Sequence, residues 1–75
     1  MNVYFILVNT KPLEEQHAYM TISKMGEVSE IHPLFGEYDF LVKVETLNNE
    51  DAKKIIDKIR MVKGILATKT LTGIK

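Results

Sequence analysis

The chain has 75 residues, with ten basic and ten acidic side chains and a formal net charge of zero. This length fits one domain over residues 1–75, and the balanced charge argues against a surface built to follow nucleic-acid phosphates. No cysteine is present, which excludes disulfides, thiolate catalysis and cysteine-ligated metal sites. The apolar run at residues 3–8 is too short for a membrane span or a signal-peptide core, so we expect a cytoplasmic protein.

Residues 3–9 predict a central strand that is apolar on both of its faces. Side chains alternate along a strand, so each face can be listed separately. One face carries Val3, Phe5 and Leu7, and the other carries Tyr4, Ile6 and Val8. The two helical segments that follow are too few to cover both sides of a sheet. We therefore expect another copy of the chain to cover the second face.

A first helix is predicted over residues 12–25, with Pro12 in its first turn and Gly26 ending it. Its apolar face is irregular, because Leu13 and Met20 fall outside the stripe formed by Ala18, Ile22 and Met25.

A second helix is predicted over residues 49–62, capped by Asn48 or Asn49 and stopped by Gly64. Its apolar side chains form one narrow arc, which consists of Ala52, Ile55, Ile56, Ile59 and Val62. The lysines of this helix face away from the arc and suit a solvated surface.

The remaining strands are predicted over residues 27–35, 38–45 and 65–73, with a tight turn at Gly36-Glu37 joining the first two. The order strand–helix–strand, repeated twice, predicts an α+β, ferredoxin-like βαββαβ fold. Short connections and right-handed crossovers give a four-stranded antiparallel sheet of order 4-1-3-2, with two helices on one face.

Few residues suggest catalysis or metal binding. His17 and His32 lie on different elements and do not have the sequence spacing of a metal-ligand pair, so no metal is expected. No serine lies in a recognisable nucleophile motif, so neither enzyme activity nor a cofactor is expected. The segment Gly36-Glu37-Tyr38-Asp39 is more informative, because a glycine turn exposes N–H donors beside carboxylates. A free amino acid requires that combination, and hydroxyls from Thr68 and Thr70 could complete the site.

The chain resembles the effector-binding domain of the Lrp/AsnC regulators, also called the RAM domain. The residues that carry the resemblance are Tyr4-Phe5-Ile6-Leu7-Val8, Lys11-Pro12, Met25-Gly26-Glu27-Val28, Gly36-Glu37-Tyr38-Asp39-Phe40-Leu41-Val42-Lys43-Val44, Lys63-Gly64-Ile65 and Thr68-Lys69-Thr70. The similarity covers essentially the whole chain, and the Gly-Glu-Tyr-Asp hairpin is its most specific part.

The resemblance implies a homodimer that pairs sheet faces, assembly of dimers into rings of commonly eight or ten subunits, and an amino-acid effector at the seam between dimers. The implied site residues are Gly36, Glu37, Tyr38, Asp39, Thr68, Thr70 and Thr72. Asp39 is expected to hold the ammonium group or to brace the hairpin.

Full regulators of this family carry an N-terminal helix-turn-helix domain, whereas this chain begins at its first strand. It resembles the stand-alone form, for which we expect no direct DNA binding and an effect through a full-length regulator. Two alternatives remain open. One is a cofactor-free enzyme of the dimeric ferredoxin-like class, with His32 and Tyr4 in its cavity, and the other is an ACT-type amino-acid-binding module.

Overall fold

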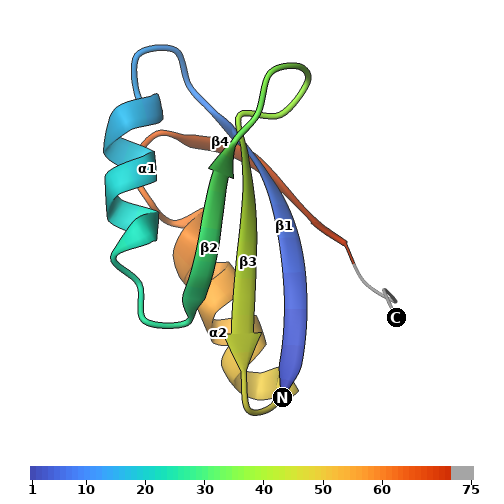
Figure 1. Ribbon diagram of the computed structural model, residues 1–75. Coiled ribbons are helices and arrows are strands. Elements are labelled where there is room, and N and C mark those ends of the chain that lie inside the picture. The colour runs from blue at the N-terminus through green and yellow to red at the C-terminus, as the bar shows by residue number, and fades with distance from the viewer. Residues whose placement is uncertain (72–75) are drawn as a thin grey trace.

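A computed structural model describes residues 1–71 as one antiparallel sheet with two helices packed on one of its faces (Figure 1). The strand order is β2-β3-β1-β4, which confirms the predicted ferredoxin-like topology. The elements in chain order are β1 (Asn2–Thr10), α1 (Glu15–Ser23), β2 (Val28–Pro33), β3 (Phe40–Thr46), α2 (Asn49–Arg60) and β4 (Ile65–Leu71).

The two faces of β1 differ as its alternating pattern predicts. Ile6 and Val8 are completely buried beneath the helices, while Val3 on the opposite face is 45% exposed. The pairing of β1 with β3 places Val42 opposite Ile6 and Leu41 opposite Leu7, so each face continues across the sheet. The buried cluster consists of Ile6, Val8, Ala18, Ile22, Phe40, Val42, Val44, Ile55 and Ile59.

The second helix follows the sequence prediction closely. Asn48 caps it by accepting a hydrogen bond from the backbone N–H of Asp51 at 2.8 Å. Ala52, Ile55 and Ile59 are buried against the sheet, as their spacing predicts.

The first helix is shorter at both ends than predicted. Leu13 adopts a left-handed φ of 70°, which is incompatible with a helix, so α1 begins at Glu15 and Pro12 lies outside it. The helix ends at Ser23, with Lys24 as its C-terminal cap, so it stops before Gly26.

Gly64 lies in the connection from α2 to β4, at a position where a side chain would be strained. Its φ is +95°, and a Cβ at this position would lie 2.5 Å from the Cβ of Glu14. The Gly64 carbonyl also accepts a hydrogen bond from the Lys11 backbone at 2.8 Å. This glycine therefore allows the β1–α1 and α2–β4 connections to approach each other closely.

The connection between β2 and β3 is longer than the predicted two-residue turn. β2 ends at Pro33 and β3 begins at Phe40, so a loop over residues 34–39 joins them. The last strand is described to Leu71, and the rest of its predicted range lies outside the described residues. No helix among residues 1–71 has the length and apolar character needed to cross a membrane.

Candidate functional site

The loop over residues 34–39 is closed at its base by backbone hydrogen bonds. The Leu34 N–H donates to the Asp39 carbonyl at 2.8 Å, and the Asp39 N–H donates to the carbonyl of Val8 at 2.9 Å. The second bond joins the loop to the central strand β1. The base of the hairpin is therefore fixed to the sheet.

The Asp39 side chain adds a second connection to the same strand. Its Oδ2 atom accepts hydrogen bonds from the Thr10 backbone N–H at 2.7 Å and from the Thr10 hydroxyl at 2.9 Å. Thr10 is nearly buried, with 8% of its surface exposed. Asp39 thus braces the hairpin, which was one of its two expected roles, and its Oδ1 atom has no hydrogen-bond partner within residues 1–71.

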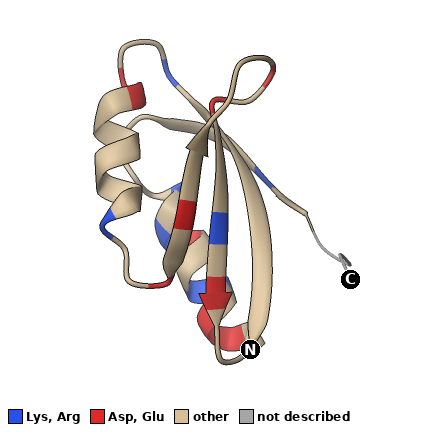
Figure 2. Ribbon diagram, in the orientation of Figure 1, with Lys and Arg blue, Asp and Glu red and all other residues tan. Residues whose placement is uncertain are grey.

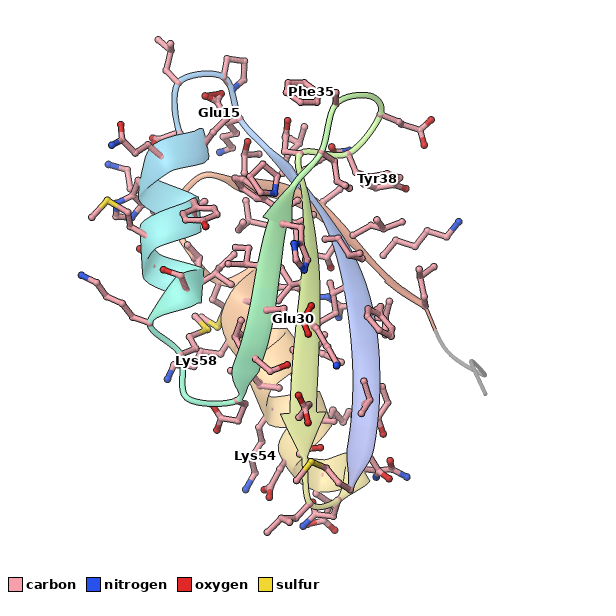
Figure 3. The ribbon with its side chains drawn as sticks, in the orientation of Figure 1. Glu15, Glu30, Phe35, Tyr38, Lys54 and Lys58 are labelled. Atoms are coloured by element: carbon pink, nitrogen blue, oxygen red, sulfur yellow. The ribbon has the colours of Figure 1, made fainter. Side chains whose placement is uncertain are left out.

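The tip of the loop, in contrast, is open. Gly36 has a φ of +140°, and the backbone N–H groups of residues 35–38 form no hydrogen bond within residues 1–71. Phe35 is fully exposed, and Figure 3 shows it and Tyr38 on opposite sides of the loop. The loop therefore presents free backbone donors beside the Glu37 carboxylate, the pattern that an amino acid requires.

The β4 threonines lie on the helix-facing side of the sheet. Thr68 pairs with Val8 and Thr70 pairs with Ile6 across the β1–β4 ladder. The Thr68 hydroxyl accepts a hydrogen bond from Arg60 Nε at 3.0 Å, whereas the buried Thr70 hydroxyl has no partner in the described part of the chain. Thr72, also a predicted site residue, lies outside the described residues.

The two main hollows found within residues 1–71 lie away from the hairpin and from the described β4 threonines. A hollow of about 550 Å³ lies between the helices, and another of about 380 Å³ lies between α1 and the sheet. The second is lined by Glu15, Gln16, Tyr19, Pro33 and Phe40. Neither hollow is lined by residues 34–39 or by a β4 threonine.

The open face of the sheet has an apolar centre and a charged border. Its apolar side chains lie mainly on the two central strands and on β4; they are Val3, Phe5, Leu7, Leu41, Ala67 and Leu71. Toward the β2 edge, Glu30 accepts hydrogen bonds from His32 at 2.8 Å and Lys43 at 3.4 Å. Figure 2 shows this alternation of acidic and basic bands along β2 and β3.

The charged border alters the acidity of Glu30. The hydrogen bond with His32, followed by the hydrogen bond and charge of Lys43, lowers the pKa of Glu30 below its ordinary value of 4.5. This carboxylate therefore remains charged to lower pH than an isolated glutamate.

The residues suggested for an enzyme cavity lie on opposite faces. The Tyr4 hydroxyl points to the helix side and donates a hydrogen bond to Asn49 Oδ1, while His32 belongs to the open face. The structure therefore does not bring them together. Within residues 1–71 no group of three potential metal ligands is found.

Comparison with known proteins agrees with this fold. The family model for the Lrp/AsnC ligand binding domain matches residues 3–75. The HTH-type transcriptional regulator FL11 from Pyrococcus horikoshii is 31% identical over 71 residues, which cover 95% of this chain and 47% of that protein.

Two solved structures show the same architecture. The crystal structure of FFRP-DM1 is 37% identical, with a TM-score of 0.91 over 99% of this chain and 100% of that one. The regulator NMB0573 from Neisseria meningitidis, solved as a complex with L-Met, is 18% identical, with a TM-score of 0.80 over 97% of this chain and 49% of that one.

The chain spans about half the length of the curated regulators that it matches. The family-model match covers nearly all of its residues, and the strand order is the one predicted from the sequence. The chain belongs to the Lrp/AsnC ligand-binding domain family.

Proposed function

We propose that residues 1–75 form a single RAM-type domain that senses an amino acid and regulates transcription without enzymatic activity of its own. The observation that carries this proposal is the hairpin, whose base is fixed by Asp39 while its tip keeps free N–H donors. Such an arrangement provides a rigid platform for a carboxylate. The family match supports a ligand-binding role.

The effector site is completed by a second copy of the chain. The proposed ligand-binding residues are Gly36, Glu37, Tyr38, Asp39, Thr68, Thr70 and Thr72. Neither of the two hollows described above within residues 1–71 is lined by the hairpin or by Thr68 or Thr70, which supports a site that another subunit helps to form. In this arrangement Asp39 Oδ1, which has no partner within residues 1–71, accepts from the effector ammonium.

The open sheet face provides the first contact between copies. Phe5, Leu7 and Leu41 form the apolar centre of this face. Leu7 pairs with Leu41 across β1 and β3, whereas Phe5 pairs with Lys43 at the charged border. Pairing two such faces removes this surface from water, which stabilises the dimer. We propose that dimers then form rings of eight or ten subunits, and that the assembly acts in the cytoplasm on a full-length Lrp/AsnC regulator.

A thermal-shift screen against the twenty amino acids tests the sensor role. A ligand present at about one hundred times its dissociation constant adds roughly 2.7 kcal/mol to stability. L-Met belongs in the panel because NMB0573 was solved in complex with it. If no amino acid raises the unfolding temperature, the sensor proposal is wrong.

Variants of the loop show whether a stabilising amino acid uses the proposed site. Replacing Gly36 with Val adds a side chain at a φ of +140° and blocks access to the free N–H groups, so the thermal shift should disappear. The matched control is Gly26→Val, because Gly26 is also exposed and a Cβ there meets no atom within 4 Å. An equal response from both variants would exclude the hairpin.

A further inference from the structure

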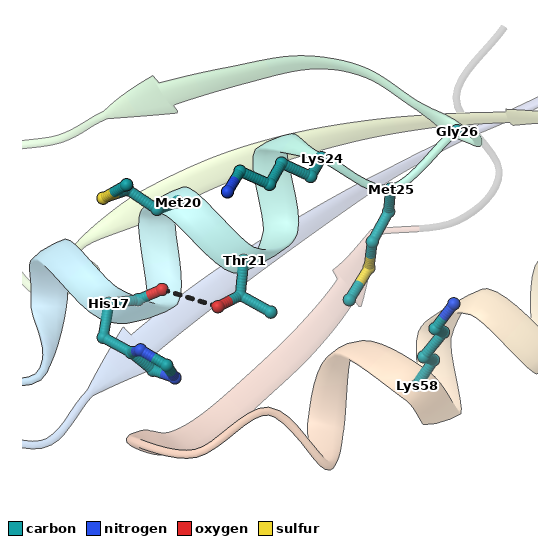
Figure 4. Close-up of a pocket in the computed structure, with 7 residues that line it drawn as sticks. All are labelled: His17, Met20, Thr21, Lys24, Met25, Gly26 and Lys58. Atoms are coloured by element: carbon teal, nitrogen blue, oxygen red, sulfur yellow. Dashed lines mark hydrogen bonds between the residues drawn. The ribbon is translucent and has the colours of Figure 1, made fainter.

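A basic groove lies between the two helices, away from the hairpin and from the open sheet face. It has a volume of about 550 Å³ and is lined by His17, Met20, Thr21, Lys24, Met25, Gly26 and Lys58. Figure 4 shows Met25 extending from the end of α1 toward α2, with Lys58 extending toward it. The groove is thus formed by residues that are far apart in the sequence.

The charged side chains that line this groove are all basic. Lys24 and Lys58 are exposed, and neither forms an ion pair within residues 1–71. No acidic side chain lines the groove, and His17 adds a third basic group. By contrast, Lys43 and Arg60 each lie beside a carboxylate elsewhere on the molecule. The groove therefore concentrates positive charge that the described protein does not neutralise.

Lysines near helix ends can also serve to compensate the negative end of the helix dipole. Here the last carbonyls already have other partners. The Ile22 carbonyl accepts from the Met25 N–H at 3.0 Å, and the Lys58 carbonyl accepts from the Met61 N–H at 3.2 Å. Within residues 1–71 neither Lys24 nor Lys58 donates a side-chain hydrogen bond or forms an ion pair, so both ammonium groups keep their N–H donors for a ligand.

The chemistry of the lining selects among anions. Lysine presents a compact point charge that suits phosphate, whereas no arginine is present to bind a planar carboxylate through two parallel bonds. The volume lies within the range of small-molecule sites. Gly26 leaves one end open, since a Cβ at that position would meet no atom within 4 Å.

From these observations we propose that the α1–α2 groove binds a small phosphate-bearing anion, at a site separate from the amino-acid site. Lys58 binds the phosphate oxygens from α2, and Lys24, whose side chain extends toward Met20 in Figure 4, turns toward Lys58 to bind them from α1; His17 borders the same space. Met20 and Met25 contact the rest of the ligand. A regulator domain with both sites would respond to two different metabolite classes.

Titration of the ¹⁵N-labelled domain with pyrophosphate at low salt tests the proposal, with inorganic phosphate and ATP as further probes. The dissociation constant for pyrophosphate should be on the order of 1 mM or lower. Amide shifts should concentrate at residues 17–26 and around Lys58. Shifts confined to the hairpin, or no saturable shifts, would overturn the proposal.

Charge-neutralising variants make the test specific. Lys24→Gln and Lys58→Gln should each weaken pyrophosphate binding about tenfold, because each removes hydrogen bonds to a charged group. The control is Lys54→Gln, an exposed lysine on α2 that does not line the groove, and it should bind as the parent does. Equal weakening by all three variants, or tight binding of a short DNA duplex without pyrophosphate binding, would contradict a small-anion site.

Discussion

The two faces of the sheet carry similar apolar residues but differ in how they are covered. On the helix side, Ile6, Val8 and Val42 have no exposed surface, because α1 and α2 lie over them. On the other side, Phe5, Leu7 and Leu41 remain partly exposed, and no described element lies over them. The comparison shows that this chain completes only one of its two apolar layers. The second layer is where we place the contact between copies.

The largest difference between the faces should appear in paired alanine variants of β1. Ile6→Ala should cost about 3 kcal/mol of unfolding free energy, because it leaves a cavity in the packed core. Leu7→Ala removes a partly exposed side chain, so its cost within one subunit should be below about 1 kcal/mol.

Urea denaturation at several protein concentrations distinguishes the two variants further. The Ile6→Ala cost should not depend on concentration, whereas the Leu7→Ala cost should grow with concentration as the parent dimer forms. Equal and concentration-independent costs would mean that the faces do not differ in the way proposed.

Gly64, which is buried, and Gly26, which is exposed, provide a second contrast with a smaller expected effect on stability. Gly64→Ala should lose about 2 kcal/mol, because a Cβ would clash with Glu14 at a left-handed φ. Gly26→Ala should change stability by no more than about 0.5 kcal/mol, since its Cβ would lie in open space. Thermal unfolding of both variants measures this difference, and similar losses would exclude the close approach at Gly64.

Asp39 and Glu37 allow the base of the hairpin to be compared with its tip. Asp39→Ala should cost about 1.5 kcal/mol, because it leaves the Thr10 N–H and hydroxyl without their acceptor. Glu37→Ala removes an exposed side chain for which no hydrogen bond is found within residues 1–71, and should be nearly neutral. Chemical denaturation gives both values. A neutral Asp39→Ala would show that the hairpin is held by backbone bonds alone.

The smallest effect concerns the charged border of the open face. The pKa of Glu30 is lowered in the folded protein, so its ionised form stabilises the fold. This contribution to the free energy of unfolding is fully present above the ordinary glutamate pKa of 4.5 and is lost as the pH falls through the folded pKa. The parent should therefore lose stability with acidification slightly more steeply than Glu30→Gln. Unfolding curves collected between neutral and strongly acidic pH measure the slope, and identical slopes would remove Glu30 from this role.

Much of the fold could be predicted because local patterns and tertiary packing agree. The alternation in β1 and the apolar arc of α2 each match the face that the structure buries. In α1 the local sequence pattern and the structure disagree. Pro12 predicts a helix start, but Leu13 adopts a left-handed conformation, so the helix begins later in the chain. Nothing in a helical pattern reveals such a backbone conformation.

The candidate site was less predictable, because its contacts join distant parts of the chain. The bond between Asp39 and Thr10 depends on how β1 pairs with β3, and an isolated hairpin motif contains no such information. Likewise, the contact of Tyr4 with Asn49 follows from the position of α2 against the sheet end. The face of the sheet on which Thr68 and Thr70 lie also depends on the register of β4 against β1, which has an irregularity near Thr10.

Sedimentation equilibrium of the purified domain, together with a Leu41→Asp variant, tests most directly whether copies pair through the open face. The parent should show a mass of at least twice its 8.6 kDa chain at micromolar concentration. The variant, which places a charge at the centre of that face, should sediment as a folded monomer with an unchanged circular dichroism spectrum. A parent that remains a single chain at high concentration, or a variant that assembles as the parent does, would contradict the account.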